Sequence, residues 1–385
     1  MIKACAFILS LLLLAQTTVA APDHIKIGVF LSLTGATAAY GMSSINAIEL
    51  ATEEVNRSGG INGKPIQLFI EDDHSNTLEV MGVVEKLIKE DKVDALIGEP
   101  VSTRAEMGAI VAQRSGVVMI SPAAIKPELT IDRDHVFRAC FISPAEGEAI
   151  AKFAFNNLKA RKAAILLEFQ NDYASVLGSY IIEWFRKLGG EVINRQQYRS
   201  GDTDLTLSMS SIIESNVDVI FAPGFYTTAP LVARSVKQSG FKGILIGSDG
   251  WDSPRLLEGG SEPFEGVYFA NHFWTGSEDQ LVRKFVVNYR AKYGVEPDAC
   301  AATAYDAAHM LFDAFRRAKT TERSAVRDAL AQTKDFRGVT GKITLDENRN
   351  ARVPVYMLRI ERGGKFTLQH QSIPTAAKII QGAEA

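Results

Sequence analysis

The stretch DALIGEPVSTRAEMGAIVAQRSGVVMISPAAI, residues Asp94–Ile125, decides the fold. Its apolar start, Ala95–Ile97, predicts a short buried strand, and Val117–Ile120 predicts a second one. Between them, a Gly-x-Pro loop and the helical spacing of apolar residues predict a helix that Ser102 or Thr103 caps. A strand, a loop, a helix and a strand in this order predict a parallel α/β unit.

Polar groups of this stretch are predicted to gather at one edge of the sheet. Ligands of doubly wound sheets lie beyond the carboxyl ends of the strands, where loops meet helix N-termini. Such N-termini present free N–H groups and a partial positive charge, which suit a carboxylate. We therefore predict that Ser102, Thr103 and the Ala123–Ile125 loop surround an anionic group. An ordinary strand–helix turn with a cap is the alternative.

The same pattern occurs twice in the chain. Asp94 and Asp218 each stand at the start of an apolar strand, and each precedes a Ser-Gly turn by 21 positions. After each turn comes a strand that ends in a small polar loop, Ser121-Pro122-Ala123 in one half and Gly247-Ser248-Asp249 in the other. These matches predict two lobes of like topology whose strand ends face a shared cleft.

The remaining third of the chain lacks another full α/β unit, so we expect it to complete the two lobes. Lobe 1 is predicted to comprise residues 22–141 and 272–349, and lobe 2 residues 142–271 and 350–373. Three crossings then join two doubly wound α/β lobes. Residues 374–385 are predicted to be a tail. Two lobes also fit the chain length, because single hydrophobic cores stop growing near ~250–300 residues.

The N-terminus has the three parts of a secretory signal peptide, namely Lys3, the apolar run Ala6–Leu14 and small residues up to Ala21. We expect residues 1–21 to be removed and the mature protein to be exported. No later segment approaches the ~20 apolar residues of a membrane helix. Cys140 and Cys300 remain after cleavage, and we expect two buried thiols, with a disulfide as the alternative.

Charge and motifs exclude several functions. The chain has 42 Lys and Arg against 45 Asp and Glu without a basic cluster, so a nucleic-acid partner is not expected. It lacks a dinucleotide-binding G-x-G-x-x-G loop, a Walker loop, a nucleophile elbow and paired histidines at metal spacing. Asp72-Asp73-His74 is interpreted as a solvated turn. The sequence therefore predicts no enzyme, cofactor or metal, but a small-molecule site between the lobes.

Aromatic and acidic residues near the strand ends are the candidate lining of that site. Tyr40 and Tyr173 each stand at the first strand–helix loop of a half, where they provide flat apolar walls or seal their own helix starts. Phe225 and Tyr226 follow another strand and are predicted to line the opposite wall. Asp249 is predicted to face a ligand ammonium, with a turn that caps its own backbone as the alternative.

Several runs carry a resemblance to a known family. Ile27–Gly35, Asn56–Gly63, Asp94–Gly98 with Ser102, and Ser121–Thr130 are similar to the type I periplasmic binding proteins. Within that family the chain resembles the branched-chain amino acid (Leu/Ile/Val) binding proteins of ABC transporters. The resemblance implies a monomeric periplasmic protein that binds a small carboxylate ligand by hinge closure and delivers it to membrane permease subunits. A periplasmic ligand sensor of the same fold is the alternative.

The resemblance also implies roles for single residues. Ser102 matches the serine that holds the ligand carboxylate, and Ala123 matches the position whose carbonyl accepts from the ligand ammonium. Asp249 matches the acid that pairs with this ammonium. The aromatic walls match Tyr40 and Tyr173, with Phe225 where a tyrosine is common.

The chain departs from the family pattern at a few positions. The family's threonine that touches the ligand falls on Ile125, which offers only its N–H and adds apolar bulk. Arg104 replaces a small hydroxyl residue, and the disulfide positions of similar members fall on His74 and Val101. The family also carries aromatic acids, amides and urea, so these ligands stay open. We expect Ile125 to influence which ligand is bound.

Overall fold

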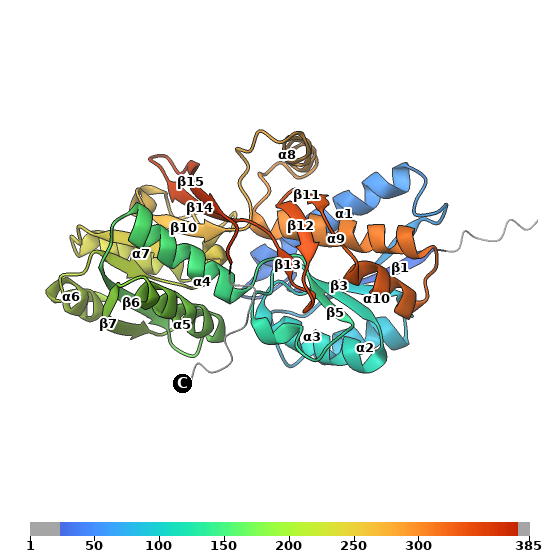
Figure 1. Cartoon of the computed structure of the whole chain (residues 1–385), viewed down its shortest axis with the longest axis horizontal. Coiled ribbons are helices and arrows are strands. Elements are labelled where there is room, and N and C mark those ends of the chain that lie inside the picture. Colours follow the sequence, from blue (N-terminus) through green and yellow to red (C-terminus); the bar gives the residue numbers. More distant parts are fainter. Residues whose placement is uncertain (1–23, 376–385) are drawn as a thin grey trace, which may run out of the picture.

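The structure, a computed structural model, describes residues 24–375. Two α/β lobes lie side by side and are joined by chain segments between them (Figure 1). The predicted fold class, two doubly wound α/β lobes joined by a three-segment hinge, is confirmed. The predicted signal peptide and residues 376–385 of the predicted tail lie outside the described residues.

The first lobe contains a five-stranded parallel sheet in the order β2-β1-β3-β4-β5. Its strands are β1 (Ile25–Leu31), β2 (Ile66–Asp72), β3 (Ala95–Gly98), β4 (Val118–Ser121) and β5 (Val136–Arg138). The central strands are apolar and buried along nearly their whole length, because helices cover both faces of a parallel sheet. The predicted strands of the opening stretch are therefore β3 and β4.

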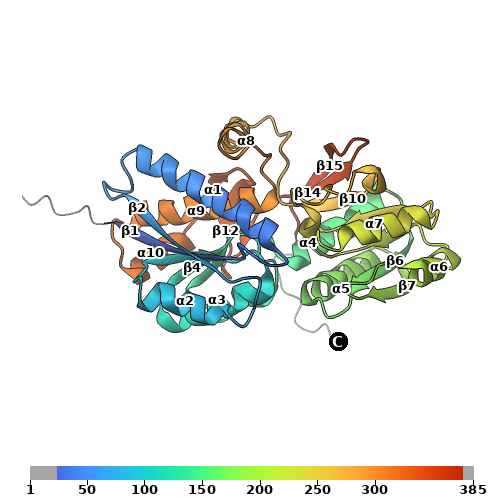
Figure 2. The ribbon, with the colours of Figure 1, turned by 180° about the vertical axis from the view of Figure 1, so that it is seen from behind.

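Helices cover both faces of this sheet, as Figure 2 shows from behind. On one face lie α1 (Ala38–Arg57), α9 (Ala299–Ala318) and α10 (Arg323–Ala331), and on the other α2 (Val80–Lys89) and α3 (Ser102–Ser115). The helix α8 (Gln280–Tyr293) packs against α1, and the 3-10 helix η1 (Pro127–Leu129) packs against α3. Because α9 and α10 come from the last third of the chain, this lobe is discontinuous in sequence.

The second lobe contains a seven-stranded sheet in the order β15-β14-β10-β9-β8-β6-β7. Its parallel strands are β6 (Lys162–Glu168), β7 (Glu191–Tyr198), β8 (Val219–Phe221), β9 (Ile244–Gly247) and β10 (Tyr268–Asn271). Two antiparallel strands, β14 (Val355–Ile360) and β15 (Phe366–Ser372), complete it. Its helices are α4 (Ser143–Lys152), α5 (Asp172–Lys187), α6 (Thr206–Glu214) and α7 (Ala229–Gln238), with a π-helical turn at Phe153–Asn157 and 3-10 helices η3 (Asp249–Trp251) and η4 (Glu262–Phe264).

The chain passes between the two lobes three times. The first crossing joins β5 to α4, and the second joins β10 to α8. The third follows a small sheet of β11 (Phe336–Gly338), β12 (Gly341–Leu345) and β13 (Ala351–Arg352) and leads into β14. The predicted lobe boundaries at residues 142 and 272 fall in the first two crossings. The third crossing comes after β13, slightly beyond the predicted boundary at residue 350.

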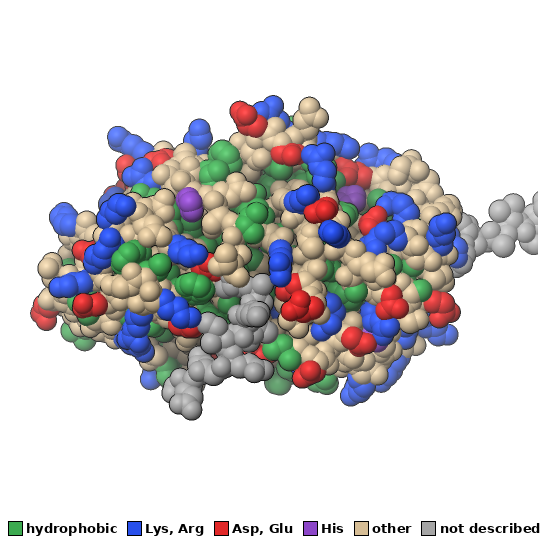
Figure 3. Space-filling view, viewed as in Figure 1, with side chains coloured by type: hydrophobic (Ala, Val, Ile, Leu, Met, Phe, Trp, Pro, Cys, Tyr) green, Lys and Arg blue, Asp and Glu red, His purple; other side chains and the backbone are tan. Residues whose placement is uncertain are grey.

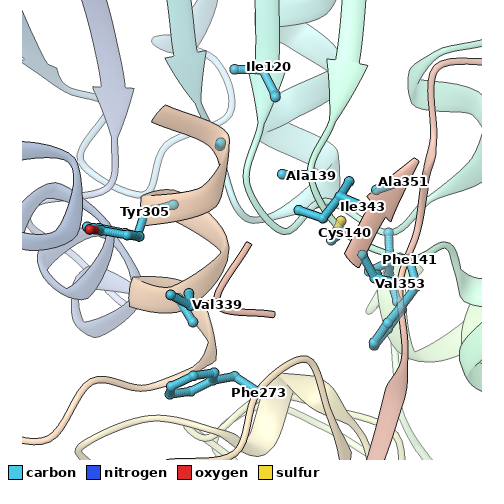
Figure 4. Packing of buried hydrophobic residues seen from close by; sticks show 14 of the residues in the cluster. Ile120, Ala139, Cys140, Phe141, Phe273, Tyr305, Val339, Ile343, Ala351 and Val353 are labelled. Carbon is cyan, nitrogen blue, oxygen red and sulfur yellow. The ribbon is translucent and has the colours of Figure 1, made fainter. Parts of the chain in front are cut away.

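One hydrophobic cluster spans the three crossings. Cys140 and Phe141 lie close to Ala351 and Val353, and Phe273 belongs to the same buried cluster (Figure 4). All five side chains are at most 5% exposed, so the crossings are packed rather than solvated. This packing ties the hinge to the strand ends that face the cleft. Cys140 and Cys300 are both buried free thiols, as the sequence predicts.

The surface carries mixed charge. On the face shown in Figure 3, basic and acidic side chains alternate over both lobes. Within residues 24–375, no helix is both long and apolar enough to cross a bilayer. In the same residues, no group of His, Cys, Asp and Glu side chains is arranged to hold a metal ion.

Candidate functional site

In the first lobe, the loops after β3 and β4 form one wall of the cleft. The hydroxyl of Ser121 donates to the carbonyl of Glu99 over 2.8 Å and accepts from the amide of Ala124 over 3.2 Å, so it joins the two loops. Arg138 is fully buried and donates to the carbonyls of Ala124 and Lys126, each over 2.7 Å. These bonds hold the loop that carries Ala123.

The predicted cap of α3 is wrong. Val101 occupies the N-cap position, and no side chain caps the helix. Ser102 is instead the first helical residue, and its hydroxyl accepts from the amide of Lys126 over 3.2 Å. The amides of Ser102 and Thr103 find no hydrogen-bond acceptor within residues 24–375, as expected for the first turn of a helix. The start of α3 therefore presents a hydroxyl and free N–H groups.

In the second lobe, aromatic rings and one acid form the opposite wall. Tyr173, in the first turn of α5, stacks on Phe225 with ring centroids 4.7 Å apart. Its hydroxyl lies 2.8 Å from that of Ser248 and also donates to a carboxylate oxygen of Asp249. Gly250 must be glycine, because a Cβ there would lie 2.5 Å from the carbonyl oxygen of Gly224. The wall is thus closely packed around Asp249.

Hydrogen bonds cross from one lobe to the other at this point. The hydroxyl of Tyr40, in the first turn of α1, donates to the carbonyl of Gly250. The hydroxyl of Tyr226 donates to the carbonyl of Ala36 over 3.0 Å. Burial raises the pKa values of Tyr40 and Tyr173 well above the usual value, so both remain neutral phenols that donate. The lobes are in direct contact across the cleft.

Asp249 is the centre of a buried polar cluster. Its second carboxylate oxygen lies 2.8 Å from Nε2 of His272, and its amide donates to Glu146 over 2.9 Å. Glu146 is 0% exposed, and its other carboxylate oxygen has no partner within residues 24–375. Burial, together with the nearby charge of Asp249, raises the pKa of Glu146 well above 4.5. Burial and the neighbouring Asp249 thus favour the protonated form of Glu146.

These walls enclose a small cavity. Its lining residues are Tyr40, Pro100, Val101, Ser102, Ala123, Tyr173, Phe225, Asp249, Gly250, His272, Ala299 and Cys300. None of them is Lys or Arg, so the lining offers an acid but no permanently charged base. The cavity measures about 30 Å³, whereas pockets for small ligands measure roughly 300–1,000 Å³. Entry of a ligand therefore requires the lobes to move apart.

The structure brings six of the ten predicted site residues together in this lining. They are Tyr40, Ser102, Ala123, Tyr173, Phe225 and Asp249.

The other four predicted residues lie behind or beside the lining. Thr103 is half-buried one position further along α3, and Ala124 is buried with its carbonyl bonded to Arg138. Ile125 is 1% exposed, and its side chain packs in the hydrophobic core. The ring of Tyr226 packs edge-on against Tyr40 at 4.9 Å. The side chain of Ile125 does not line the cavity, so in this structure it has no direct contact by which to influence the choice of ligand.

Arg104 does not face the cleft either. Its guanidinium donates to Thr37 over 2.7 Å and to Glu99 over 3.3 Å, and it lies 3.7 Å from Asp73. The prediction that Asp72-Asp73-His74 is a solvated turn is wrong for Asp73, which is 0% exposed. Burial raises the pKa values of both Asp73 and Glu99, and Arg104 opposes this shift. This cluster supports the loop before α3 from behind.

Sequence reasoning missed His272, Glu146 and Cys300 as residues of the site. Glu146 had a local signal, because Ser143-Pro144-Ala145-Glu146 is a helix-start pattern with proline near the first turn and glutamate three positions after serine. His272 had none, because it immediately follows β10 in a crossing and meets Asp249 only through the tertiary fold.

Comparison with known proteins decides the family. Residues 24–365 match a family described as periplasmic binding protein. The chain belongs to this family. A Leu/Ile/Val-binding protein homolog of Brucella abortus is 26% identical over 351 residues, covering 90% of this chain and 94% of the relative.

Solved structures lead to the same group. A leucine-binding protein of Thermotoga maritima is 34% identical, with a TM-score of 0.85 over 90% of this chain and 98% of its own. The substrate-binding protein LivJ of a branched-chain amino acid transporter from Streptococcus pneumoniae, solved with isoleucine, is 30% identical, with a TM-score of 0.84 over 91% and 99%. The resemblance to type I periplasmic and branched-chain amino acid binding proteins is confirmed.

Proposed function

We propose that this protein is the extracytoplasmic binding protein of an ABC importer and that it binds a hydrophobic α-amino acid between its lobes. One observation supports this proposal most directly. The free N–H groups and hydroxyl at the start of α3 and the carboxyl group of Asp249 line the same cavity, whose lining contains no Lys or Arg. A zwitterion complements both ends, whereas a plain carboxylic acid leaves Asp249 without a cation.

The carboxylate end of the ligand belongs to the first lobe. Ser102 lines the cavity and offers its hydroxyl, and the amides of Ser102 and Thr103 point from the positive end of α3. A carboxylate there accepts hydrogen bonds from the two amides, which have no acceptor within residues 24–375, and from the Ser102 hydroxyl, which can donate while it accepts from Lys126. Hydrogen bonds to an ionised group contribute roughly 1.5–3 kcal/mol each.

The ammonium end belongs mainly to the second lobe. Asp249 supplies the charge, and the carbonyl of Ala123, which accepts no hydrogen bond from residues 24–375, supplies a further acceptor from the first lobe. A desolvated ion pair interacts more strongly than an exposed one, so closure of the lobes tightens binding. Tyr40, Tyr173 and Phe225 enclose the apolar side chain of the ligand.

Hinge closure links binding to transport. The three crossings pack around Phe141 and Phe273, while Tyr40 of one lobe bonds to Gly250 of the other. The closed form therefore carries contacts that the open form lacks, and permease subunits are the partners that distinguish the two forms. The relatives are binding proteins rather than enzymes, and we expect no turnover of the ligand.

The test uses the mature protein and a panel of ligands. Leucine, isoleucine, valine and phenylalanine are compared with benzoate, acetamide and urea by thermal shift and isothermal titration calorimetry. Two matched compounds test the contribution of each charged end of leucine. 4-Methylpentanoate lacks the ammonium, and 3-methylbutylamine lacks the carboxylate. We expect binding of amino acids and at least tenfold weaker binding of both truncated compounds. Tighter binding of benzoate or 4-methylpentanoate than of any amino acid would reject the proposal.

A further inference from the structure

His272 connects the hinge to the acid of the site. It immediately follows β10 in the second crossing, and its ring stacks on Phe141 of the first crossing with centroids 3.7 Å apart and an angle of 20°. Its Nε2 lies 2.8 Å from Asp249, and the side chain lines the cleft at 2% exposure. The imidazole is therefore fixed in position by the hinge and not by the ligand.

The surroundings of the neutral ring favour one tautomer. Nε2 faces a carboxylate, so it carries a hydrogen. Nδ1 is buried and has no partner within residues 24–375, so a hydrogen there would be a buried donor without an acceptor. The neutral Nε2–H tautomer donates a hydrogen bond to Asp249 without bringing a positive charge to it. The imidazolium would instead neutralise that charge.

We propose that His272 is a positioning residue for Asp249 and that protonation of His272 releases a cationic ligand, so that affinity falls on acidification. This inference rests on the proposed function, since it assigns a proton-linked regulation to the same site. A histidine is suited to this role because its charge changes between about pH 5 and 8. Binding of an ammonium beside Asp249 then expels one proton from the imidazole.

Other titratable groups lie near His272 and require controls. Glu146 from α4 and Tyr173 from α5 both contact Asp249, and the thiols of Cys140 and Cys300 lie nearby. Burial raises the pKa values of all four groups, which keeps the phenol and the two thiols neutral near pH 7 and favours the protonated form of Glu146.

Two further acids lie beyond His272. Asp252 accepts from Asn271 and from the amide of Ala299, each over 2.8 Å, and Asp298 caps α9. Burial and the charge of Asp252 raise the pKa of Asp298 to about 7, so Asp298 is the main rival as the group that titrates.

The first experiment measures the dissociation constant of leucine by calorimetry from pH 8 to pH 5, a range in which leucine stays zwitterionic. In the wild type we expect a rise of about tenfold per pH unit below the midpoint of the imidazole titration, because one proton competes with the ligand. His272→Gln keeps an amide donor toward Asp249 but does not titrate. It should lose the pH dependence of leucine binding between pH 8 and pH 5, whatever its affinity at pH 8.

Two matched variants locate the proton. His370→Gln changes a histidine in β15 that stacks on Phe153 away from the cleft, and Asp298→Asn keeps a helix cap but removes its titration. Both should retain the wild-type slope. A wild-type slope in His272→Gln, or a flat profile in Asp298→Asn, would overturn the proposal.

A second measurement does not depend on any ligand. Nitrogen-15 NMR of the ligand-free protein should show the Nε2–H tautomer of His272 at pH 8, and Asp249→Asn should move the midpoint of its titration to lower pH. If the Nδ1–H tautomer dominates, or if the midpoint does not move, the role of His272 fails even where leucine binds. If no amino acid binds at pH 8 while the NMR results hold, the proposed function fails instead.

Discussion

Each lobe holds a pair of acidic side chains at or near the cleft, and the two pairs differ in the basic group that lies beside them. In the first lobe, Arg104 stands between Asp73 and Glu99. In the second lobe, no Lys or Arg within residues 24–375 pairs with Glu146 or Asp249, and His272 is the basic side chain beside Asp249. A permanent cation makes the first cluster a structural support. Without one, the second cluster is left ready to accept a cation from outside.

The largest effect on stability is expected when the permanent cation of the first cluster is removed. Arg104→Ala leaves Asp73 and Glu99 buried without a counter-charge, and we expect a loss of roughly 3–5 kcal/mol in the free energy of unfolding, measured in urea at pH 7. The control is Arg57→Ala, because the Arg57 side chain is 70% exposed beside Glu53, and this change should cause no measurable loss. Equal stability of the two variants would contradict a structural role for the first cluster.

The second largest effect, on leucine binding, is expected when the acid Asp249 of the second cluster is replaced. Asp249→Asn should weaken leucine binding by roughly 30-fold or more, because it leaves a buried ammonium without its counter-ion. The thermal midpoint of the ligand-free protein should not fall, since no permanent cation depends on Asp249. Calorimetry and thermal unfolding test both statements. If Asp249→Asn binds leucine normally but unfolds at a lower temperature, then the second cluster has a structural role and not a binding role.

A third, smaller effect concerns the carboxylate end of the ligand. Ser102→Ala should weaken leucine binding by roughly 10–100-fold, because it removes one hydrogen bond to an ionised group. Thr103→Ala is the matched control, since its side chain does not line the cavity, and it should bind as the wild type does. Equal losses of leucine affinity in the two variants would show that the Ser102 hydroxyl is not the group that binds the ligand carboxylate.

The smallest effect on affinity is expected for Glu146→Gln. Glutamine keeps the acceptor for the Asp249 amide and resembles the neutral acid, so leucine binding at pH 7 should change little. The pKa of Glu146 is raised above 4.5 by burial and by Asp249, so the folded state binds this proton more tightly than the unfolded state. Wild-type stability therefore falls as pH rises above about 4.5, and the variant should lose this part of the decline. Urea unfolding at several pH values measures the difference, and identical pH profiles would contradict it.

Much of the framework could be predicted from local patterns. Asp94 and Asp218, which occupy matching positions in the two halves, make similar hydrogen bonds in both lobes. Each accepts from a backbone amide at or next to the start of a neighbouring strand, from Lys26 over 2.8 Å and from Lys162 over 2.9 Å. The position of the site at the strand ends was also predictable, because a parallel sheet places the loops that bind ligands at one edge. Six of the ten predicted site residues meet there.

The remaining site residues could not be predicted because their roles depend on contacts far apart in the chain. Arg104 was interpreted as a departure near the ligand, yet Asp73, 31 positions earlier in the sequence, and Glu99 turn it away from the cleft. Ile125 was expected at the ligand, but the same loop turns its side chain into the core.

The sequence by itself determined which segments form strands and helices, that the α/β pattern occurs twice, and which loops face the cleft, because apolar periodicity and turn residues are local properties. Only the tertiary structure decided how buried charge is balanced. The partners of Asp73, Glu146 and Asp249 come from other strand ends, from the first turns of helices α3 and α5, and from the crossings between lobes. A charge buried in the fold is compensated by whatever group packs against it, and that group has no fixed distance along the chain.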